Sequence, residues 1–208
     1  MMIKEYITKL SKKINDESYY VELNSENISD IYVRKSSINK PHDKDESVYD
    51  DEELDDDRDE NDAVAVSDII NGTSRIVLLG NPGSGKTTII NNMMRKYLNR
   101  CADGDYSLVP FLILLKDIHN LSDWESVVSA LTDSNEFYQL MTTGNVILML
   151  DGLNELSANC HKDVITRIQR LMDEFGQMPI VMTSRKSNYK HELDLEEYQI
   201  LDFDEGAI

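Results

Sequence analysis

Residues 75–87 read Arg75-Ile76-Val77-Leu78-Leu79-Gly80-Asn81-Pro82-Gly83-Ser84-Gly85-Lys86-Thr87. The part from Gly80 to Thr87 matches the pattern G-x-x-x-x-G-K-[ST] at every required position. Chance would produce such a match in a chain of this length with odds of about a few in a thousand. Because an apolar run ends at Leu79 and a helix is expected from about Lys86, the turn joins a buried strand to a helix. The pattern predicts a phosphate-binding loop, called the phosphate loop below.

Each residue type in the phosphate loop has a chemical reason. Glycines allow the backbone to approach a phosphate closely, and the N–H groups of the loop and of the helix start attract the anion. Lys86 supplies an ammonium group for the outer phosphates, and the Thr87 hydroxyl is suited to ligate Mg²⁺. We therefore expect a nucleotide, ATP or GTP, to contact Gly80, Asn81, Pro82, Gly83, Ser84, Gly85, Lys86, Thr87 and Thr88.

A second candidate position is the acid at the end of another apolar run. Residues 146–150 read as a buried strand, and Asp151 follows directly. A carboxylate at this edge of a parallel sheet is suited to hold Mg²⁺ together with Thr87. Glu155 lies four positions further on, where a catalytic base could orient an attacking water. The alternative for Glu155 is an ordinary acid at a helix start, which is favourable by itself.

The segment Thr183-Ser184-Arg185 ends the next apolar run. A hydroxyl and a guanidinium at the same sheet edge could sense the γ-phosphate, and Arg185 is therefore a third candidate catalytic residue. The alternative is that Arg185 and Lys186 form a plain surface pair.

Strands and helices alternate after about residue 68. Continuous apolar runs typical of strands covered on both faces occupy residues 75–79, 110–115, 145–150 and 179–183, with a weaker one at 198–203. Helical patterns occupy residues 87–100, 124–131, 136–142 and 161–175. This alternation predicts an α/β fold in three layers, with a central, mainly parallel five-stranded sheet and helices on both faces.

The first third of the chain is organised differently. Residues 1–39 contain a helical stripe, Ile3, Ile7, Leu10 and Ile14, and a short strand at residues 19–23. Residues 40–62 are strongly acidic, with 13 acids against Lys44 and Arg58 from Asp43 to Asp62. Such a segment cannot bury enough apolar surface to order itself, so we interpret it as a disordered linker. Residues 63–208 then form the nucleotide-binding domain.

Composition excludes several classes of protein. The longest apolar runs have five or six residues, which is too short for a membrane span, and the N-terminus lacks the pattern of a secretory signal. Two distant cysteines indicate reduced thiols and a cytoplasmic location, and no histidine or cysteine lies at metal-ligand spacing. The net charge of −18 disfavours binding to nucleic acid.

These motifs together resemble the NACHT subgroup of STAND P-loop NTPases over about residues 64–203. The resemblance rests on Val77–Thr88, Val109–Asp117, Leu148–Leu156 and Ile180–Arg185. The small residue Gly152 after Asp151 and the acid at Glu155 fit the family pattern. Asn154 stands where an aspartate is usual.

The resemblance implies ATP binding with Mg²⁺, slow hydrolysis, and a nucleotide-driven change from a closed monomer to a signalling oligomer. It also implies that the strand ending at Thr183 lies between those ending at Leu79 and Asp151. Similar proteins are antiviral defence sensors in bacteria and innate immune receptors in animals. Because the family continues into helical, winged-helix and sensor domains, we expect this chain to hold only the nucleotide-binding core, as a fragment or a truncated gene product.

Two other functions fit the same motifs. One is a nucleotide-binding scaffold without catalysis, which the asparagine at position 154 favours. The other is a small-molecule phosphotransferase, because nucleotide kinases have similar phosphate loops. Kinases usually have Gly-Thr after the loop lysine, whereas this chain has Thr87-Thr88.

Overall fold

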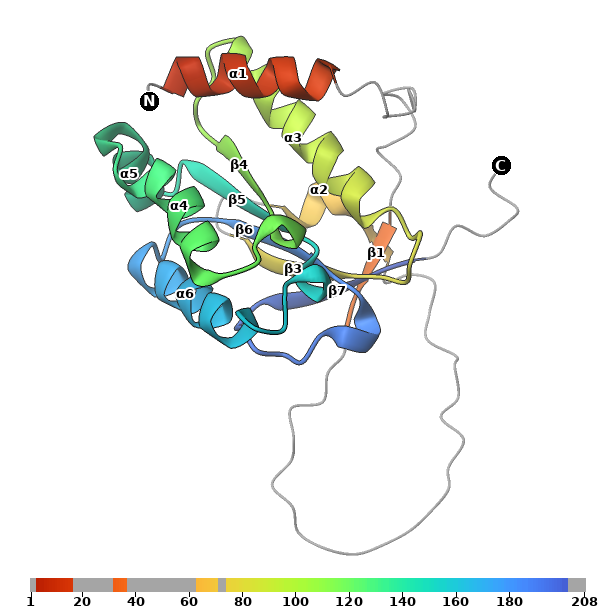
Figure 1. Cartoon of the computed structure of the whole chain (residues 1–208). Coiled ribbons are helices and arrows are strands. Elements are labelled where there is room, and N and C mark those ends of the chain that lie inside the picture. The colour runs from red at the N-terminus through yellow and green to blue at the C-terminus, as the bar shows by residue number, and fades with distance from the viewer. Residues whose placement is uncertain (1–2, 17–31, 37–62, 71–73, 202–208) are drawn as a thin grey trace, which may run out of the picture.

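The computed structural model describes residues 3–16, 32–36, 63–70 and 74–201 (Figure 1). The strand predicted at residues 19–23 and the acidic linker at 40–62 lie outside these residues.

A single sheet runs through the described part of the chain. Its strands are β1 (Tyr32–Lys35), β2 (Ala63–Ala65), β3 (Arg75–Leu79), β4 (Val109–Leu114), β5 (Val146–Asp151), β6 (Ile180–Ser184) and β7 (Glu196–Ile200). Their order is β2-β1-β7-β3-β6-β5-β4. The neighbours from β7 to β4 are all parallel, and β1 is antiparallel to both β7 and β2. The five predicted parallel strands are confirmed, and two antiparallel strands that were not predicted extend the sheet to seven.

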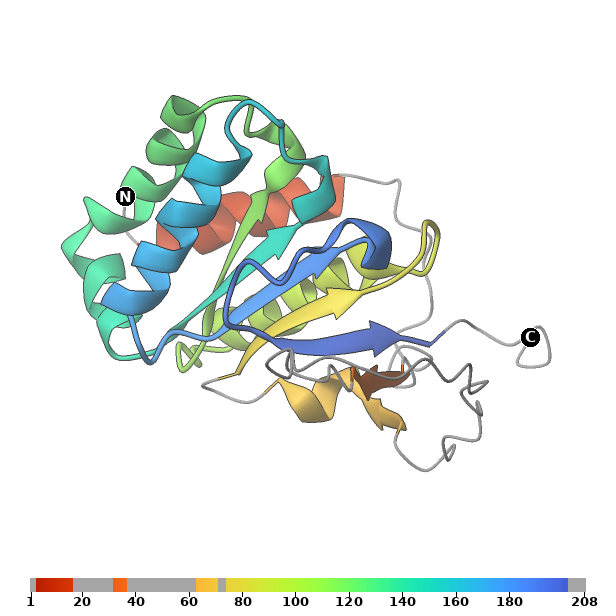
Figure 2. The ribbon, with the colours of Figure 1, turned by 90° about the horizontal axis from the view of Figure 1, so that it is seen from below.

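Helices cover both faces of the sheet. They are α1 (Ile3–Asp16), α2 (Val66–Ile69), α3 (Lys86–Ala102), α4 (Leu121–Thr132), α5 (Asn135–Thr142) and α6 (His161–Glu174). Helices α1 and α3 lie on one face, while α6 lies on the other with α4 beside it (Figures 1 and 2). The expected three-layer α/β architecture is therefore confirmed.

The parallel strands are buried because helices cover them on both faces. All residues of β5 before Asp151 are buried, as are all residues of β6. Helix α3 turns its predicted apolar stripe to the sheet, with Ile89, Ile90, Met93, Met94 and Leu98 buried. Buried apolar area of this kind is the main stabilising term in a domain of this size.

The N-terminal segments pack on the rest of the domain. Helix α1 contacts α3, and the Tyr6 hydroxyl donates a hydrogen bond of 3.1 Å to the carbonyl of Pro110 in β4. Strand β1 pairs with β7, so that Val33 lies opposite Ile200. The division at residue 39 stays a prediction, but both described segments before it contact the sheet or its helices.

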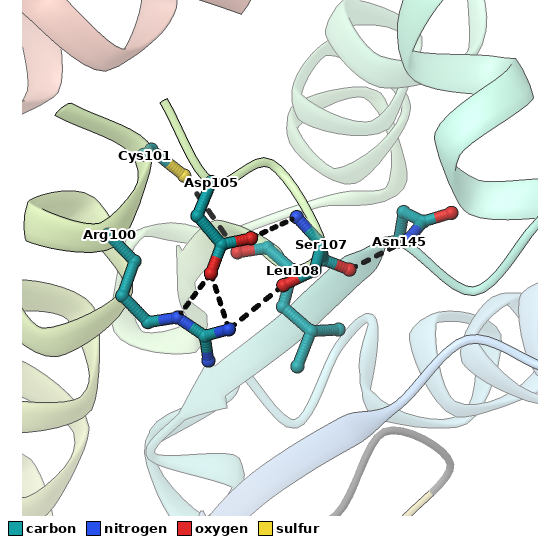
Figure 3. A network of polar contacts seen from close by, with 6 residues as sticks. All are labelled: Arg100, Cys101, Asp105, Ser107, Leu108 and Asn145. Atoms are coloured by element: carbon teal, nitrogen blue, oxygen red, sulfur yellow. Dashed lines mark hydrogen bonds and ion pairs between the residues drawn. The ribbon is translucent and has the colours of Figure 1, made fainter. Parts of the chain in front are cut away.

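The loop between α3 and β4 lies at the amino-terminal edge of the parallel strands. There the Arg100 guanidinium binds Asp105 and Ser107, and the Asn145 amide binds the carbonyl of Ser107 at 2.8 Å (Figure 3). These contacts fix the C-terminal end of α3, whose first turn belongs to the phosphate loop.

Within the described ranges, no helix is long and apolar enough to cross a membrane.

Candidate nucleotide-binding site

The carboxyl ends of β3, β5 and β6 meet at one edge of the sheet, and a cleft of about 340 Å³ opens there. Ligands of parallel α/β folds bind at this edge. Of the residues predicted from the sequence, those that line the cleft are Pro82, Gly83, Gly85, Lys86, Thr87, Thr88, Asp151, Glu155 and Arg185. Gly152, Asn154 and Thr183 line it as well.

The phosphate loop has the backbone that its glycines allow. Gly83 and Gly85 both have φ of 83°, a left-handed conformation that side-chain-bearing residues adopt only with strain. Gly80 packs against Ser84 within the loop. A β-carbon at Gly80 would lie 2.2 Å from the Ser84 hydroxyl oxygen, so a side chain there would force this hydroxyl to move.

Lys86 reaches back over its own loop. Its ammonium donates hydrogen bonds to the carbonyls of Gly80 at 2.9 Å and Asn81 at 2.6 Å, and to the Ser84 hydroxyl at 3.2 Å. Gly80, Asn81 and Ser84, which were expected to touch nucleotide, thus hold the lysine. Partial burial lowers the pKa of Lys86, and the charge of Arg185 lowers it further, while Asp151 and Glu155 oppose the shift.

Asp151 is held between two hydroxyl groups. Its Oδ2 accepts a hydrogen bond of 3.0 Å from Thr87, and its Oδ1 accepts one of 2.5 Å from Thr183. Thr87 and Asp151, the two predicted Mg²⁺ ligands, therefore lie beside each other, and their role as ligands stays a prediction. One of the two hydroxyls in Thr183-Ser184-Arg185, that of Thr183, donates its single proton to Asp151.

Glu155 lies on a short turn after β5, and Arg185 directly follows β6. The 3₁₀ turn η3 (Leu153–Glu155) begins after Gly152, whose φ is 83° and whose Cα lies beneath the Glu155 side chain. Arg185 is exposed and precedes the turn η4 (Lys186–Asn188). Its backbone N–H donates a hydrogen bond of 3.0 Å to Oδ1 of Asn154.

The contacts that Thr183 and Asn154 make across the ends of β5 and β6 were not predicted. Both contacts join residues that are 31 or 32 positions apart. Only the pairing of β5 with β6, where Leu150 lies opposite Met182, brings them together. The signal in the sequence was the occurrence of polar residues at the end of one apolar run, Thr183, and shortly after the other, Asn154.

The residues of the cleft fit a magnesium–nucleotide complex. Thr87 and Asp151 offer only oxygen ligands, which Mg²⁺ prefers. The backbone N–H groups around Gly83 and Gly85 and the first turn of α3 form the kind of cradle that binds phosphate groups.

Comparison with known proteins identifies the family. A family model described as novel STAND NTPase 3 matches residues 60–206. The chain belongs to this family. The novel STAND NTPase 3 match confirms the resemblance to STAND P-loop NTPases, while the NACHT subgroup stays a prediction. No curated protein matches the chain.

Several solved structures are similar to the novel STAND NTPase 3 domain at low identity. The Aeropyrum pernix ORC1 protein in complex with DNA has a TM-score of 0.48 and 17% identity, covering 63% of this chain and 40% of that one. Drosophila ORC bound to DNA has a TM-score of 0.44 and 16% identity, covering 64% of this chain and 38% of that one. C. elegans PCH-2 has a TM-score of 0.40 and 19% identity, covering 67% of this chain and 38% of that one. The chain therefore matches about two fifths of the length of these proteins.

Proposed function

We propose that this chain is the ATP-binding and slowly ATP-hydrolysing switch module of a signalling or antiviral defence sensor. The hydrogen bond of 3.0 Å between Thr87 and Asp151 carries the proposal, because it joins the phosphate loop to the acidic strand end. The same pair of oxygen ligands is suited to hold Mg²⁺ against a triphosphate. GTP offers the same phosphates, so the residues described here fit either nucleotide.

Each residue has a defined part in this proposal. Lys86 exchanges its contacts with the loop carbonyls for the outer phosphates, and the N–H groups of the loop bind the inner ones. Bound Mg²⁺ supplies positive charge against the charge that develops on the phosphoryl oxygens. Arg185 lines the cleft, and its guanidinium is the group that contacts the γ-phosphate.

Glu155 is the proposed base. Its carboxylate accepts a proton from the water that attacks the γ-phosphorus. A new P–O bond forms while the bond to the bridging oxygen of ADP breaks, which releases ADP and phosphate. Glu155 is exposed and lines the cleft, so water reaches it.

Nucleotide binding tests the first half of the proposal. Lys86→Ala should abolish detectable binding of Mg·ATP in calorimetry, with affinity at least about a hundredfold weaker, because charged hydrogen bonds contribute about 1.5–3 kcal/mol each. Lys96→Ala is the matched control, since Lys96 is an exposed lysine of the same helix. Unchanged affinity in the Lys86 variant would refute the assignment.

Single-turnover hydrolysis tests the second half. Glu155→Gln should retain ATP binding and slow hydrolysis by about 10²–10⁴-fold, the usual contribution of a general base. A wild-type chain that binds ATP without hydrolysing it would instead be a nucleotide-binding scaffold. Transfer of the phosphate to a nucleoside monophosphate would identify a phosphotransferase.

The wider role in this proposal comes from the family. The chain belongs to the STAND NTPases, and its resemblance to NACHT proteins supports self-association of the full-length protein in a cytoplasmic signalling or defence pathway. Size-exclusion chromatography of the full-length protein with ATP and with ADP tests this role. A larger species with ATP alone is expected.

A further inference from the structure

Strands β5 and β6 separate where the cleft begins. Their last paired residues are Leu150 and Met182, although β6 continues to Ser184. Beyond this pair, side chains replace the backbone pairing. Thr183 binds Asp151, and Asn154 binds the backbone N–H of Arg185. The second contact has no part in the function proposed above.

The contact of Asn154 is well defined chemically. A backbone N–H can only donate, so the carboxamide must present its oxygen, Oδ1, to Arg185. Asn154 is half-buried and lies in η3, the turn that also carries Glu155. One hydrogen bond thus ties the turn after β5 to the point where the main chain leaves β6.

This hydrogen bond fixes the backbone position from which the Arg185 side chain extends. Arg185 is exposed, and its long side chain has many rotamers, so its direction depends on a fixed backbone. The side chains of Arg185 and Lys86 both line the cleft, so both can contribute positive charge to it. Without the hydrogen bond to Asn154, the Arg185 backbone would move more, and its guanidinium would occupy a wider range of positions.

A neutral acceptor also suits the charge of the cleft. Asp151 and Glu155 already contribute two carboxylates to the lining. An aspartate at position 154 would accept the same hydrogen bond but would add a third negative charge beside a triphosphate. Asparagine keeps the oxygen that binds Arg185 without this repulsion.

We propose that Asn154 is a positioning residue that holds Arg185 toward the γ-phosphate and so sets the preference of the site for triphosphate over diphosphate. The inference rests on the proposed function, because it requires that the chain binds ATP. It gives the asparagine at position 154 a role in nucleotide discrimination rather than in the chemical step.

The test is a double-mutant cycle read by calorimetry on the full chain. The probes are the non-hydrolysable ATP analogue AMP-PNP and ADP, each with Mg²⁺. Arg185→Ala should lower the ratio of AMP-PNP to ADP affinity at least about tenfold, and Asn154→Ala should lower it about three- to tenfold, as expected for one hydrogen bond. In the double variant, loss of Asn154 should cause no further decrease.

Two readouts separate positioning from a general structural effect. ADP affinity should be unchanged in Asn154→Ala, because ADP lacks the γ-phosphate. Asn135→Ala, which changes an exposed asparagine of α5, is the matched control and should leave the ratio unchanged. The Arg185 amide of the wild-type chain should also exchange slowly with solvent in NMR, a measurement that needs no variant.

Distinct results would overturn the inference. An unchanged ratio in either single variant, a further decrease in the double variant, or fast exchange of the wild-type Arg185 amide would each do so. If the wild-type chain bound neither nucleotide, the proposed function would fail with it. Binding of both nucleotides without discrimination would reject this inference alone.

Discussion

Thr183 has one hydroxyl group that makes two hydrogen bonds. The oxygen accepts the N–H of Gly152 at 2.8 Å, and the proton goes to Asp151. Thr183 is fully buried, and its contact with Gly152 is buried as well, which strengthens that hydrogen bond. The hydroxyl therefore fixes one oxygen of the Asp151 carboxylate and leaves the other directed at Thr87.

Replacing this hydroxyl should weaken both the fold and the site. Thr183→Val keeps the shape but leaves Asp151 Oδ1 and the Gly152 N–H without this partner, which should cost about 1–3 kcal/mol of unfolding free energy. Urea unfolding measures this loss, and calorimetry at varied Mg²⁺ should show weaker Mg²⁺-dependent nucleotide binding. Thr183→Ser retains the hydroxyl and is the control. Equal behaviour of the two variants would contradict this role.

Local pattern was sufficient to predict some of the site residues. The phosphate loop and Asp151 could be predicted because each motif lies within a few neighbouring positions. The partners of Thr183 and Asn154 could not, because they depend on the register between β5 and β6. The packing of Ser84 against Gly80 could not be predicted either, because it depends on how the loop folds back on itself.

At the scale of elements, the connection from α3 to β4 depends on Asp105. The Asp105 carboxylate accepts two hydrogen bonds from Arg100, and Ser107 donates its backbone N–H to it at 3.0 Å (Figure 3). Hydrogen bonds from Ser107, and then from Arg100, lower the pKa of Asp105 to about 2. The folded state therefore favours the ionised carboxylate.

This shift predicts a pH-dependent contribution to stability. A carboxyl group whose pKa is lower in the folded state stabilises the protein when the pH is above the ordinary pKa of the group, which is 3.8 for Asp105. The contribution is lost as the pH falls from about 4 to about 2. Asp105→Asn should therefore lower the urea midpoint at pH 7, and the difference from the wild type should narrow below about pH 4. A difference that is constant between pH 7 and pH 3 would contradict the assignment.

Elements with a strong pattern were predicted well, and those without one were missed. The stripes of α3 and α6 face the sheet as expected, and the fifth parallel strand, expected at 198–203, is β7 at Glu196–Ile200. Strands β1 and β2 were missed because they are three or four residues long. Their formation depends on pairing with β7 and with each other, which local sequence does not show.

At the scale of the whole molecule, Tyr6 joins the N-terminal helix to the sheet. Its ring stacks on Phe111 of β4 with centroids 5.5 Å apart and meets Phe137 of α5 edge-on at 5.3 Å. Three segments that are distant in sequence thus share one aromatic cluster. Burial raises the pKa of the Tyr6 hydroxyl, which stays protonated and binds Pro110.

Loss of this cluster should destabilise the whole domain. Tyr6→Ala should lower the unfolding free energy by about 3 kcal/mol, the range for large aromatic truncations, whereas Tyr6→Phe should lose only about 1 kcal/mol for the hydrogen bond. Urea unfolding followed by far-UV circular dichroism checks both values. Lys9→Ala, which changes an exposed residue of α1, is the control. A Tyr6→Ala variant as stable as this control would show that α1 does not contribute to the stability of the core.

The order of the strands has a consequence for synthesis on the ribosome. Strand β3, from which the phosphate loop extends, pairs only with β6 and β7. Roughly a hundred residues separate Leu79 from Ile180, which at about 5–20 residues per second is a delay of about 5–20 s. During this time β3, from which the phosphate loop extends, lacks both of its neighbours in the sheet. Nucleotide can therefore stabilise the loop in its final setting only after β6 and β7 have been made.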